Sequence, residues 1–284
     1  MTMLLCLGYG YCAQRFVGHH RHDFTRIVGT TRDVAARPAD GVEVLGSRDA
    51  TALAEAAAAA EMVLVSAAPG EAGDPFAGPL AAALEAGGRR GPIVYLSTIG
   101  VYGSSGGEWI DEADAPPSTS PRGLRRREAE VAWSDLGARL RRPVAVLRLG
   151  GIYGPGRNAL ADLREGTARC IERPGQVFNR IHVDDIAAAI AAAFRTGFSG
   201  VVNVVDDEPS PSCAPVRYAA GLLGIEPPPT VPYEEAVVTM SPMARSFWEE
   251  NRRVRNDRLR RELGVALAYP SYREGLDAIH AAGG

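Results

Sequence analysis

A glycine-rich turn near the amino terminus has the residue types and spacing of a phosphate-binding loop. It follows a short apolar run at 4–7 and has the pattern G-x-G-x-x-A over Gly8, Tyr9, Gly10, Tyr11, Cys12 and Ala13. In such a loop the first glycine permits a tight turn, the second lets a pyrophosphate approach the backbone, and the small last residue lets the helix pack on the strand. Amide groups at the start of that helix bind the anion. The segment therefore predicts a dinucleotide cofactor, although a plain tight turn can carry the same glycines.

The end of the second expected strand favours NADP over NAD. A site for NAD usually has an acidic residue about 20 residues after the glycines, where it binds the ribose 2′-hydroxyl. Here the strand ends in Thr31-Arg32, with no acid before Arg32. A guanidinium beside a hydroxyl suits a 2′-phosphate. Asp33 argues for NAD, and a solvated strand end is the alternative role for Arg32.

Strands and helices alternate through the first 150 residues. Apolar runs lie at 4–7, 26–29, 42–45, 62–67, 93–97 and 144–149. Helical stretches lie at 12–17, 50–60, 79–86 and 122–140. Because the runs show little polar alternation, we expect strands that are buried on both faces, as in a parallel sheet. This order predicts an α/β fold with a doubly wound parallel sheet.

After residue 150 the pattern loosens into a mixed lobe. Helices are expected at 159–171, 184–194, 214–223 and 256–263, and strands at 176–183 and 201–205. We expect residues 1–150 to form a nucleotide-binding domain and 151–284 a smaller substrate lobe, with 176–205 returning to the sheet. The stretch 246–255, with Trp248 among alternating charges, is expected to form one wall of the substrate cleft.

Composition excludes several kinds of function. All 31 basic residues are Arg, so the chain has no Lys, and 34 acidic residues give a net charge of −3. Schiff-base, pyridoxal and P-loop chemistry all need a lysine. The near-neutral charge argues against a nucleic acid or a membrane surface as partner. The cysteines lack metal-site spacing, so we expect no metal and reduced thiols in a cytoplasmic protein. They are Cys6, Cys12, Cys170 and Cys213.

Four further segments resemble the extended short-chain dehydrogenase/reductase superfamily, and the chain resembles that superfamily over nearly its whole length. They are VSAAP at 65–69, LSTIGVYG at 96–103, RLGGIYGPGR at 148–157 and RIHVDDIA at 180–187. The last three are similar to that superfamily's S-[ST]-x-x-V-Y-G, R-x-x-x-[IV]-Y-G-P-G-R and F-I-H-V-D-D-[IV]-A segments. The resemblance implies a Rossmann fold, with Ala67, Ala68, Pro69 and Ser97 beside the cofactor.

The chain departs from that superfamily at its proton-transfer pair. There a Tyr-x-x-x-Lys pair does the proton chemistry, and the Lys binds the nicotinamide ribose and lowers the Tyr pKa. The family's Y-G-x-S-K-x-A-x-E aligns on RGLRRREAE at 122–130, so Arg122 takes the Tyr position and Arg126 the Lys position. Arg126 can still bring positive charge to the ribose, but Arg122 cannot be a general acid or base near neutral pH. A solvated helix face is the alternative for this run. The chain thus resembles atypical members, commonly described as NADP-dependent epimerases or dehydratases.

Four residues are candidates for the remaining chemistry. Thr98 matches the hydroxyl that would bond a substrate carbonyl or hydroxyl. Tyr102 and Tyr153 are the nearest phenols in the matched segments, and either is a candidate acid/base, with a pocket-shaping role as the alternative. Asp74 is the nearest substitute for the Asn of the family's tetrad, with a helix N-cap as the alternative.

Four residues are candidates for substrate binding. Arg122, Arg148 and Arg157 suit an anionic substrate such as a nucleotide-sugar diphosphate. His182 is expected either to line the pocket or to pack at a strand end. An ordinary salt bridge is the alternative for Arg148 and Arg157.

Two functions follow as hypotheses. The leading one is an NADP-dependent oxidoreductase, epimerase or dehydratase acting on a small hydroxyl or carbonyl substrate, with nucleotide sugars suggested by analogy alone. The alternative is a non-catalytic NADP-binding redox sensor or scaffold. Relatives often dimerise through helices beside the Tyr-Lys pair, so a homodimer is one assembly that the resemblance allows.

Overall fold

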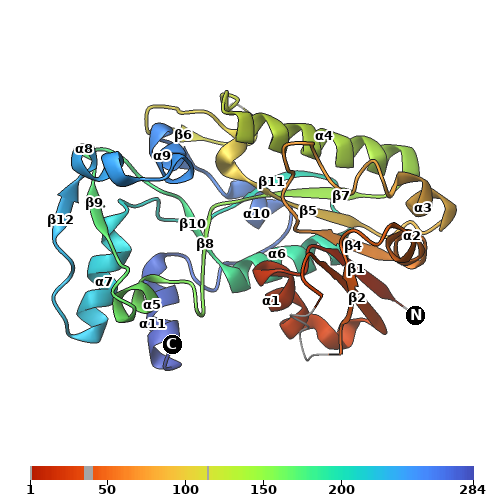
Figure 1. Ribbon diagram of the computed structural model, residues 1–284, viewed down its shortest axis with the longest axis horizontal. Coiled ribbons are helices and arrows are strands. Elements are labelled where there is room, and N and C mark those ends of the chain that lie inside the picture. Colours follow the sequence, from red (N-terminus) through yellow and green to blue (C-terminus); the bar gives the residue numbers. More distant parts are fainter. Residues whose placement is uncertain (1, 35–40, 114) are drawn as a thin grey trace.

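The main body is built on a parallel sheet of seven strands in the order β11-β7-β5-β4-β1-β2-β3 (Figure 1). The computed structural model describes residues 2–34, 41–113 and 115–284. The strands are β1 (Met3–Leu7), β2 (Arg26–Thr31), β3 (Glu43–Gly46), β4 (Met62–Val65), β5 (Ile93–Thr98), β7 (Val144–Leu149) and β11 (Gly200–Val204). The chain winds outward from β1 in one direction through β2 and β3, and in the other through β4, β5, β7 and β11. The predicted doubly wound fold is confirmed.

The strands lack polar alternation because helices cover both faces of the sheet. On β1, Leu4 and Cys6 belong to one core, while Leu5 and Leu7 belong to the other, and all are buried. The first core includes residues of α1 (Tyr11–His20) and α6 (Val183–Thr196). The second includes residues of α2 (Ala50–Ala59), α3 (Ala81–Ala86) and α4 (Pro121–Leu140). Figure 1 shows α1 and α6 on one side of the sheet and α4 on the other.

The remaining segments form a smaller lobe beside the sheet (Figure 1). Its strands are β8 (Gly151–Tyr153), β9 (Cys170–Glu172), β10 (Arg180–His182) and β12 (Thr230–Pro232), and a further short pair is β6 (Trp109–Ile110) with β13 (Arg253–Val254). Its helices are α5 (Ala159–Arg164), α7 (Cys213–Leu223), α8 (Tyr233–Ala236), α9 (Pro242–Glu249) and α11 (Tyr272–Ala281), and α10 (Asp257–Arg261) lies nearer the sheet. Among the described residues, no helix is long and apolar enough to cross a membrane.

Two sequence-based boundaries in this lobe were wrong. The helix expected at 159–171 ends at Arg164, because Gly166 has a φ of +70° and turns the chain toward β9. The strand expected at 176–183 spans only Arg180–His182. Before it, Phe178 pairs with Ser210 in an isolated bridge and not with the partner strand of β10. After β10 the chain runs through α6 into β11, the edge strand of the sheet.

The expectation of four reduced thiols was also wrong. Cys170 on β9 and Cys213 at the start of α7 form a disulfide, with their Cα atoms 4.6 Å apart. These residues lie 43 positions apart in the sequence, so only the fold brings them together. Cys6 and Cys12 are free cysteines. The bridge ties β9 to α7 within the smaller lobe.

Candidate active site

A cavity of about 1020 Å³ opens where the central strands end. Its lining comes from the segments that follow β1, β4, β5 and β7, from the first turns of α4, and from α9 with the residues after it. In open α/β sheets, ligands bind at the carboxyl ends of the strands, near the point where the strand order reverses. This cavity lies at that edge.

The first glycine of the turn is required by close packing. Gly8 has a φ of +92°, and a Cβ there would lie 2.7 Å from the backbone nitrogen of Ala67. Its N–H donates to the Thr30 hydroxyl at 2.7 Å, and the Ser66 hydroxyl donates to its carbonyl. The turn is therefore held against the ends of β2 and β4.

The second glycine has open space in front of it. A Cβ on Gly10 would meet no atom within 4 Å, so the protein's own packing does not explain a glycine there. Gly10 precedes α1, whose start has no side-chain cap and whose first turn has no acidic residue. Uncapped N–H groups and the positive end of the helix dipole attract an anion. The turn therefore fits a dinucleotide pyrophosphate.

The end of β2 fits a phosphate on the adenosine ribose. Arg32 is exposed, and within the described ranges its side chain makes no hydrogen bond or ion pair. The Thr31 hydroxyl accepts from the Asp33 N–H at 3.2 Å, which leaves its own proton available. Ala67 packs against Gly8, whereas Ala68 and Pro69 follow β4 outside the cavity lining.

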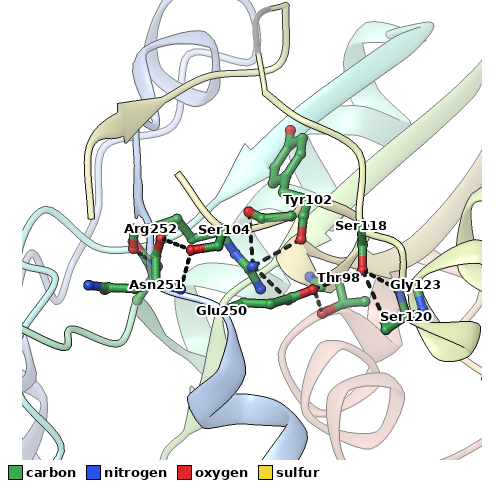
Figure 2. Close-up of polar contacts among 12 residues, drawn as sticks. Thr98, Tyr102, Ser104, Ser118, Ser120, Gly123, Glu250, Asn251 and Arg252 are labelled. Carbon is green, nitrogen blue, oxygen red and sulfur yellow. Dashed lines mark hydrogen bonds and ion pairs between the residues drawn. The ribbon is translucent and has the colours of Figure 1, made fainter. Parts of the chain in front are cut away.

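Ser97 and Thr98, at the end of β5, both line the cavity, but only Thr98 has a hydroxyl proton that is not already donated within the protein. Ser97 is 4% exposed and donates to the Glu130 carboxylate. Thr98 is half-buried and accepts from the Gly100 N–H at 3.1 Å, so its hydroxyl proton is free for a ligand (Figure 2).

Arg122 and Arg126, which the sequence aligns with the superfamily's Tyr-x-x-x-Lys pair, lie on one face of α4. Arg122, Arg126 and Glu130 repeat every four residues and so share a helix face. Arg126 donates to the Tyr95 hydroxyl and to the Leu96 carbonyl, both at 3.1 Å. It lies at the end of β5 and lines the cavity with Arg122.

Glu130 lies on the same face of α4 and belongs to a buried polar network. It forms a two-pronged ion pair with Arg148 at 2.7 and 3.0 Å. Arg148 also donates to the Tyr102 hydroxyl at 2.8 Å, and Tyr102 donates to the Asn203 side chain at 2.7 Å. Burial raises the pKa of Tyr102 despite the lowering effect of Arg148. Neither Arg148 nor Tyr102 lines the cavity, so the structure corrects their predicted roles in substrate binding and proton transfer.

The other phenols are also engaged. Tyr153 lines the cavity, but its hydroxyl donates to the Ser271 carbonyl at 3.1 Å, and burial raises its pKa. Tyr11 donates to the Pro155 carbonyl at 3.0 Å. Neither hydroxyl proton is therefore free to serve as the missing acid.

Asp74 and His182 lie away from the cavity. Asp74 accepts from the N–H groups of Phe76 and Ala77 at 2.9 and 2.8 Å, and from the Trp133 indole at 3.1 Å. It therefore acts as a turn cap, which was the alternative to a catalytic role. His182 is 1% exposed and packs against Tyr153, and burial lowers its pKa to about 4. The structure thus gives His182 a packing role.

Six arginines line the cavity: Arg122, Arg125, Arg126, Arg157, Arg180 and Arg252. Arg252 pairs with Glu250, whereas the other five have no carboxylate of a described residue within 4 Å. For Arg122, Arg125 and Arg157, no hydrogen bond of the guanidinium is found within the described ranges either. Burial and the neighbouring Arg126 lower the pKa of Arg122. So many uncompensated cations around one cavity indicate an anionic ligand.

Residues of α9 and of the stretch 246–255 line another side of the cavity. Met243, Ser246, Phe247, Trp248, Glu249, Glu250 and Arg252 line the cavity. Glu250 accepts from the Ser118 hydroxyl at 2.9 Å and from Arg252 at 2.6 Å (Figure 2). Arg252 also donates to the Tyr102 carbonyl at 2.9 Å. These hydrogen bonds join Glu250 and Arg252 to the segment between β5 and α4.

Sequence reasoning missed several of the lining residues. The spacing of Arg125 from Arg122 could have identified it, because positions i and i+3 share a helix face. Phe247 and Glu250 were expected only as members of the stretch 246–255, and no local signal gives either of them an individual role. No group of three or more metal-binding side chains occurs in the described part of the chain.

The buried ion pair gives a stability prediction. Replacing Arg148→Met leaves the Glu130 carboxylate buried without its cation, which should lower the free energy of unfolding by about 3–5 kcal/mol. Arg217→Met removes the half-exposed Arg217–Glu172 pair and should cost less than about 1 kcal/mol. Urea unfolding measures both variants, and equal losses would show that the network does not hold α4 in place.

No protein-family model matches the chain. A 3-diazoavenalumate denitrifying reductase from Streptomyces sp is 32% identical over 176 residues, which cover 59% of this chain and 55% of that protein. The match thus spans little more than half the length of this relative.

Solved structures match over almost the whole chain. A conserved protein of Silicibacter pomeroyi DSS, described as functionally unknown, is 40% identical, with a TM-score of 0.87 over 99% of both chains. A candidate NAD-dependent epimerase/dehydratase from Methylobacillus flagellatus is 25% identical, with a TM-score of 0.73 over 99% of this chain and 98% of that one.

Two more distant structures contain nucleotides. MoeE5 in complex with UDP-glucose and NAD is 20% identical, with a TM-score of 0.78 over 98% of this chain and 96% of that one. Human SDR39U1 with NADPH is 18% identical, with a TM-score of 0.75 over 99% of both chains. At these identities the likeness shows the fold alone.

The sheet order, the glycine turn and these relatives agree with the motif segments found in the sequence. The family resemblance is therefore confirmed. The chain belongs to the extended short-chain dehydrogenase/reductase superfamily, as an atypical member.

Proposed function

We propose that this protein is an NADP-dependent reductase acting on a small anionic substrate. The observation that carries the proposal is one cavity that joins Gly10 at the start of α1 to the Thr98 hydroxyl and to five arginines without carboxylate partners. The partial relative from Streptomyces is named as a reductase of an anion, 3-diazoavenalumate, which supports both parts of the proposal.

The cofactor would lie along the edge of the sheet from β2 to β5. The turn from Gly8 to Ala13 would bind the pyrophosphate, and Thr31 with Arg32 would bind the 2′-phosphate. Arg126 would lie on the ribose side of the nicotinamide, where the superfamily has its lysine. NADPH, when bound, supplies a hydride. Of the two distant nucleotide complexes, one holds NADPH and the other NAD, so the preference for NADP rests on Arg32.

Arg122 makes reduction the favoured direction. A guanidinium stays protonated, so it can stabilise a developing oxyanion by charge and hydrogen bonding but cannot remove a proton from an alcohol. Oxidation of an alcohol needs such a base, whereas the oxyanion formed by hydride addition can take its proton from water in the cavity. Thr98 would bond the same oxygen. An epimerase or dehydratase that begins with oxidation is therefore less well supported.

A non-catalytic NADP-binding sensor is the second candidate. It is favoured by one observation, which is that the hydroxyls of Tyr102 and Tyr153 are both engaged in the protein interior. This candidate shares the cofactor site and differs only in turnover.

The cofactor assignment gives a binding prediction. NADPH should bind at least about tenfold more tightly than NADH, and Arg32→Ala should remove most of that preference, because a charge-assisted hydrogen bond contributes about 1.5–3 kcal/mol. Arg89→Ala, an exposed position near the start of β5, removes the same charge away from the site. Fluorescence titration of the unaltered protein and the two variants with each cofactor measures the six affinities. Equal affinity for the two cofactors in the unaltered protein would overturn the NADP assignment.

Turnover separates the two candidates. We expect NADPH oxidation with carbonyl compounds that carry a carboxylate and little with their neutral analogues. Thr98→Val should lower kcat at least about tenfold, whereas Thr119→Val, at an exposed position outside the cavity lining, should leave it unchanged. Intact NADPH binding without turnover on any compound of the panel would favour the sensor.

A further inference from the structure

We propose that the anionic substrate is a flat aromatic carboxylate, bound between the arginine face of α4 and the apolar face of α9. This inference rests on the proposed function and names the substrate class of the same cavity. Three features carry it: two unpaired guanidiniums, two exposed apolar side chains and the contact that joins these faces.

The charged side is formed by Arg122 and Arg125. They are three residues apart on α4, both line the cavity, and both lack an ion pair and a side-chain hydrogen bond within the part of the chain that the structure describes. Arg126 lies one turn beyond Arg122, and like charges at this spacing repel. A bound carboxylate would offset that repulsion, and a guanidinium can bind it with two parallel hydrogen bonds.

The apolar side is formed by Met243 and Phe247, one turn apart on α9. They are 66% and 52% exposed, although the next residue, Trp248, is only 7% exposed and packs against Phe178 and Tyr233. The helix thus buries one apolar face in the lobe and presents another to the cavity. Large exposed apolar side chains in the wall of a cavity are typical of a ligand site.

The two faces meet at one point. The Arg122 guanidinium lies over the Phe247 ring, 5.0 Å from its centroid. Guanidinium groups and aromatic rings stack on each other. A flat conjugated ring of a ligand can therefore pack against Arg122 and Phe247 in the same way. A substrate with an aromatic body on Phe247 and a carboxylate on Arg125 would use both faces at once.

The charges on this wall favour a single carboxylate over a diphosphate. Glu249 and Glu250 line the cavity directly after Phe247 and Trp248. They would repel a doubly charged diphosphate placed beside α9, whereas a ligand with one carboxylate can turn its uncharged ring toward them. Nucleotide sugars therefore fit this part of the cavity less well.

The test is calorimetric titration of trans-cinnamate into the protein, with and without saturating NADP⁺. Cinnamate should bind, and cinnamyl alcohol, its neutral analogue, should bind at least about tenfold more weakly. Arg125→Gln and Phe247→Ser should each weaken cinnamate binding about fivefold or more. Arg127→Gln is the matched control, because Arg127 is exposed on the same helix but does not line the cavity. The melting temperature of each variant verifies its folding.

Three results would overturn the inference. They are equal binding of cinnamate and its alcohol, equal losses in Arg125→Gln and Arg127→Gln, and tighter binding of UDP-glucose than of cinnamate. Failure of the proposed function looks different, because either NADP⁺ would not bind or NADPH would bind without turnover on any compound of the panel. NADP⁺ binding without cinnamate binding would overturn this inference alone.

Discussion

The carboxylate of Glu130 is buried, and the way in which it is satisfied sets the geometry of the site. Ser97 on β5 and Arg148 on β7 both donate to it, so α4 is held against two neighbouring strands. Because Arg122 and Arg126 repeat at the helical spacing before Glu130, holding Glu130 inward turns both arginines toward the cavity. The buried network therefore decides which face of α4 a ligand meets. Tyr102 extends the network to Asn203 on β11 and is not available for chemistry.

Features that depend on local sequence could be predicted. The strands of the sheet are continuous apolar runs, and Gly8 and Gly10 stand directly after the first of them, so the fold and the cofactor turn follow from neighbouring residues. The wall at 246–255 was expected from Trp248 among charges. Arg148 belongs to a recognisable motif, but a motif does not show whether a guanidinium points into a cavity or toward a buried carboxylate. The Cys170–Cys213 bridge and the approach of Glu250 to Ser118 depend on contacts across 43 and 132 positions, which no local pattern records.

The absence of lysine from the chain affects the proton chemistry that is possible in this cavity. If Arg126 takes the Lys position, as we propose, it would keep a positive charge beside the cofactor ribose, and Arg122 at the Tyr position would replace a group that exchanges protons with one that stays protonated. Three arginines on the first turns of α4 line the cavity together with Met243 and Phe247 of α9, which ends at Glu249 and is followed by Glu250. In the proposed function, one face of α4 would thus determine both the negative charge of the substrate and the direction of hydride transfer.

The most direct test of the central claim, that the glycine turn and the end of β5 bind the dinucleotide, is hydrogen–deuterium exchange with and without saturating NADP⁺. We expect slower exchange in peptides covering residues 8–17 and 94–101, and unchanged exchange in α7 and α11 of the smaller lobe. Protection confined to the smaller lobe, or none at saturating NADP⁺, would contradict it.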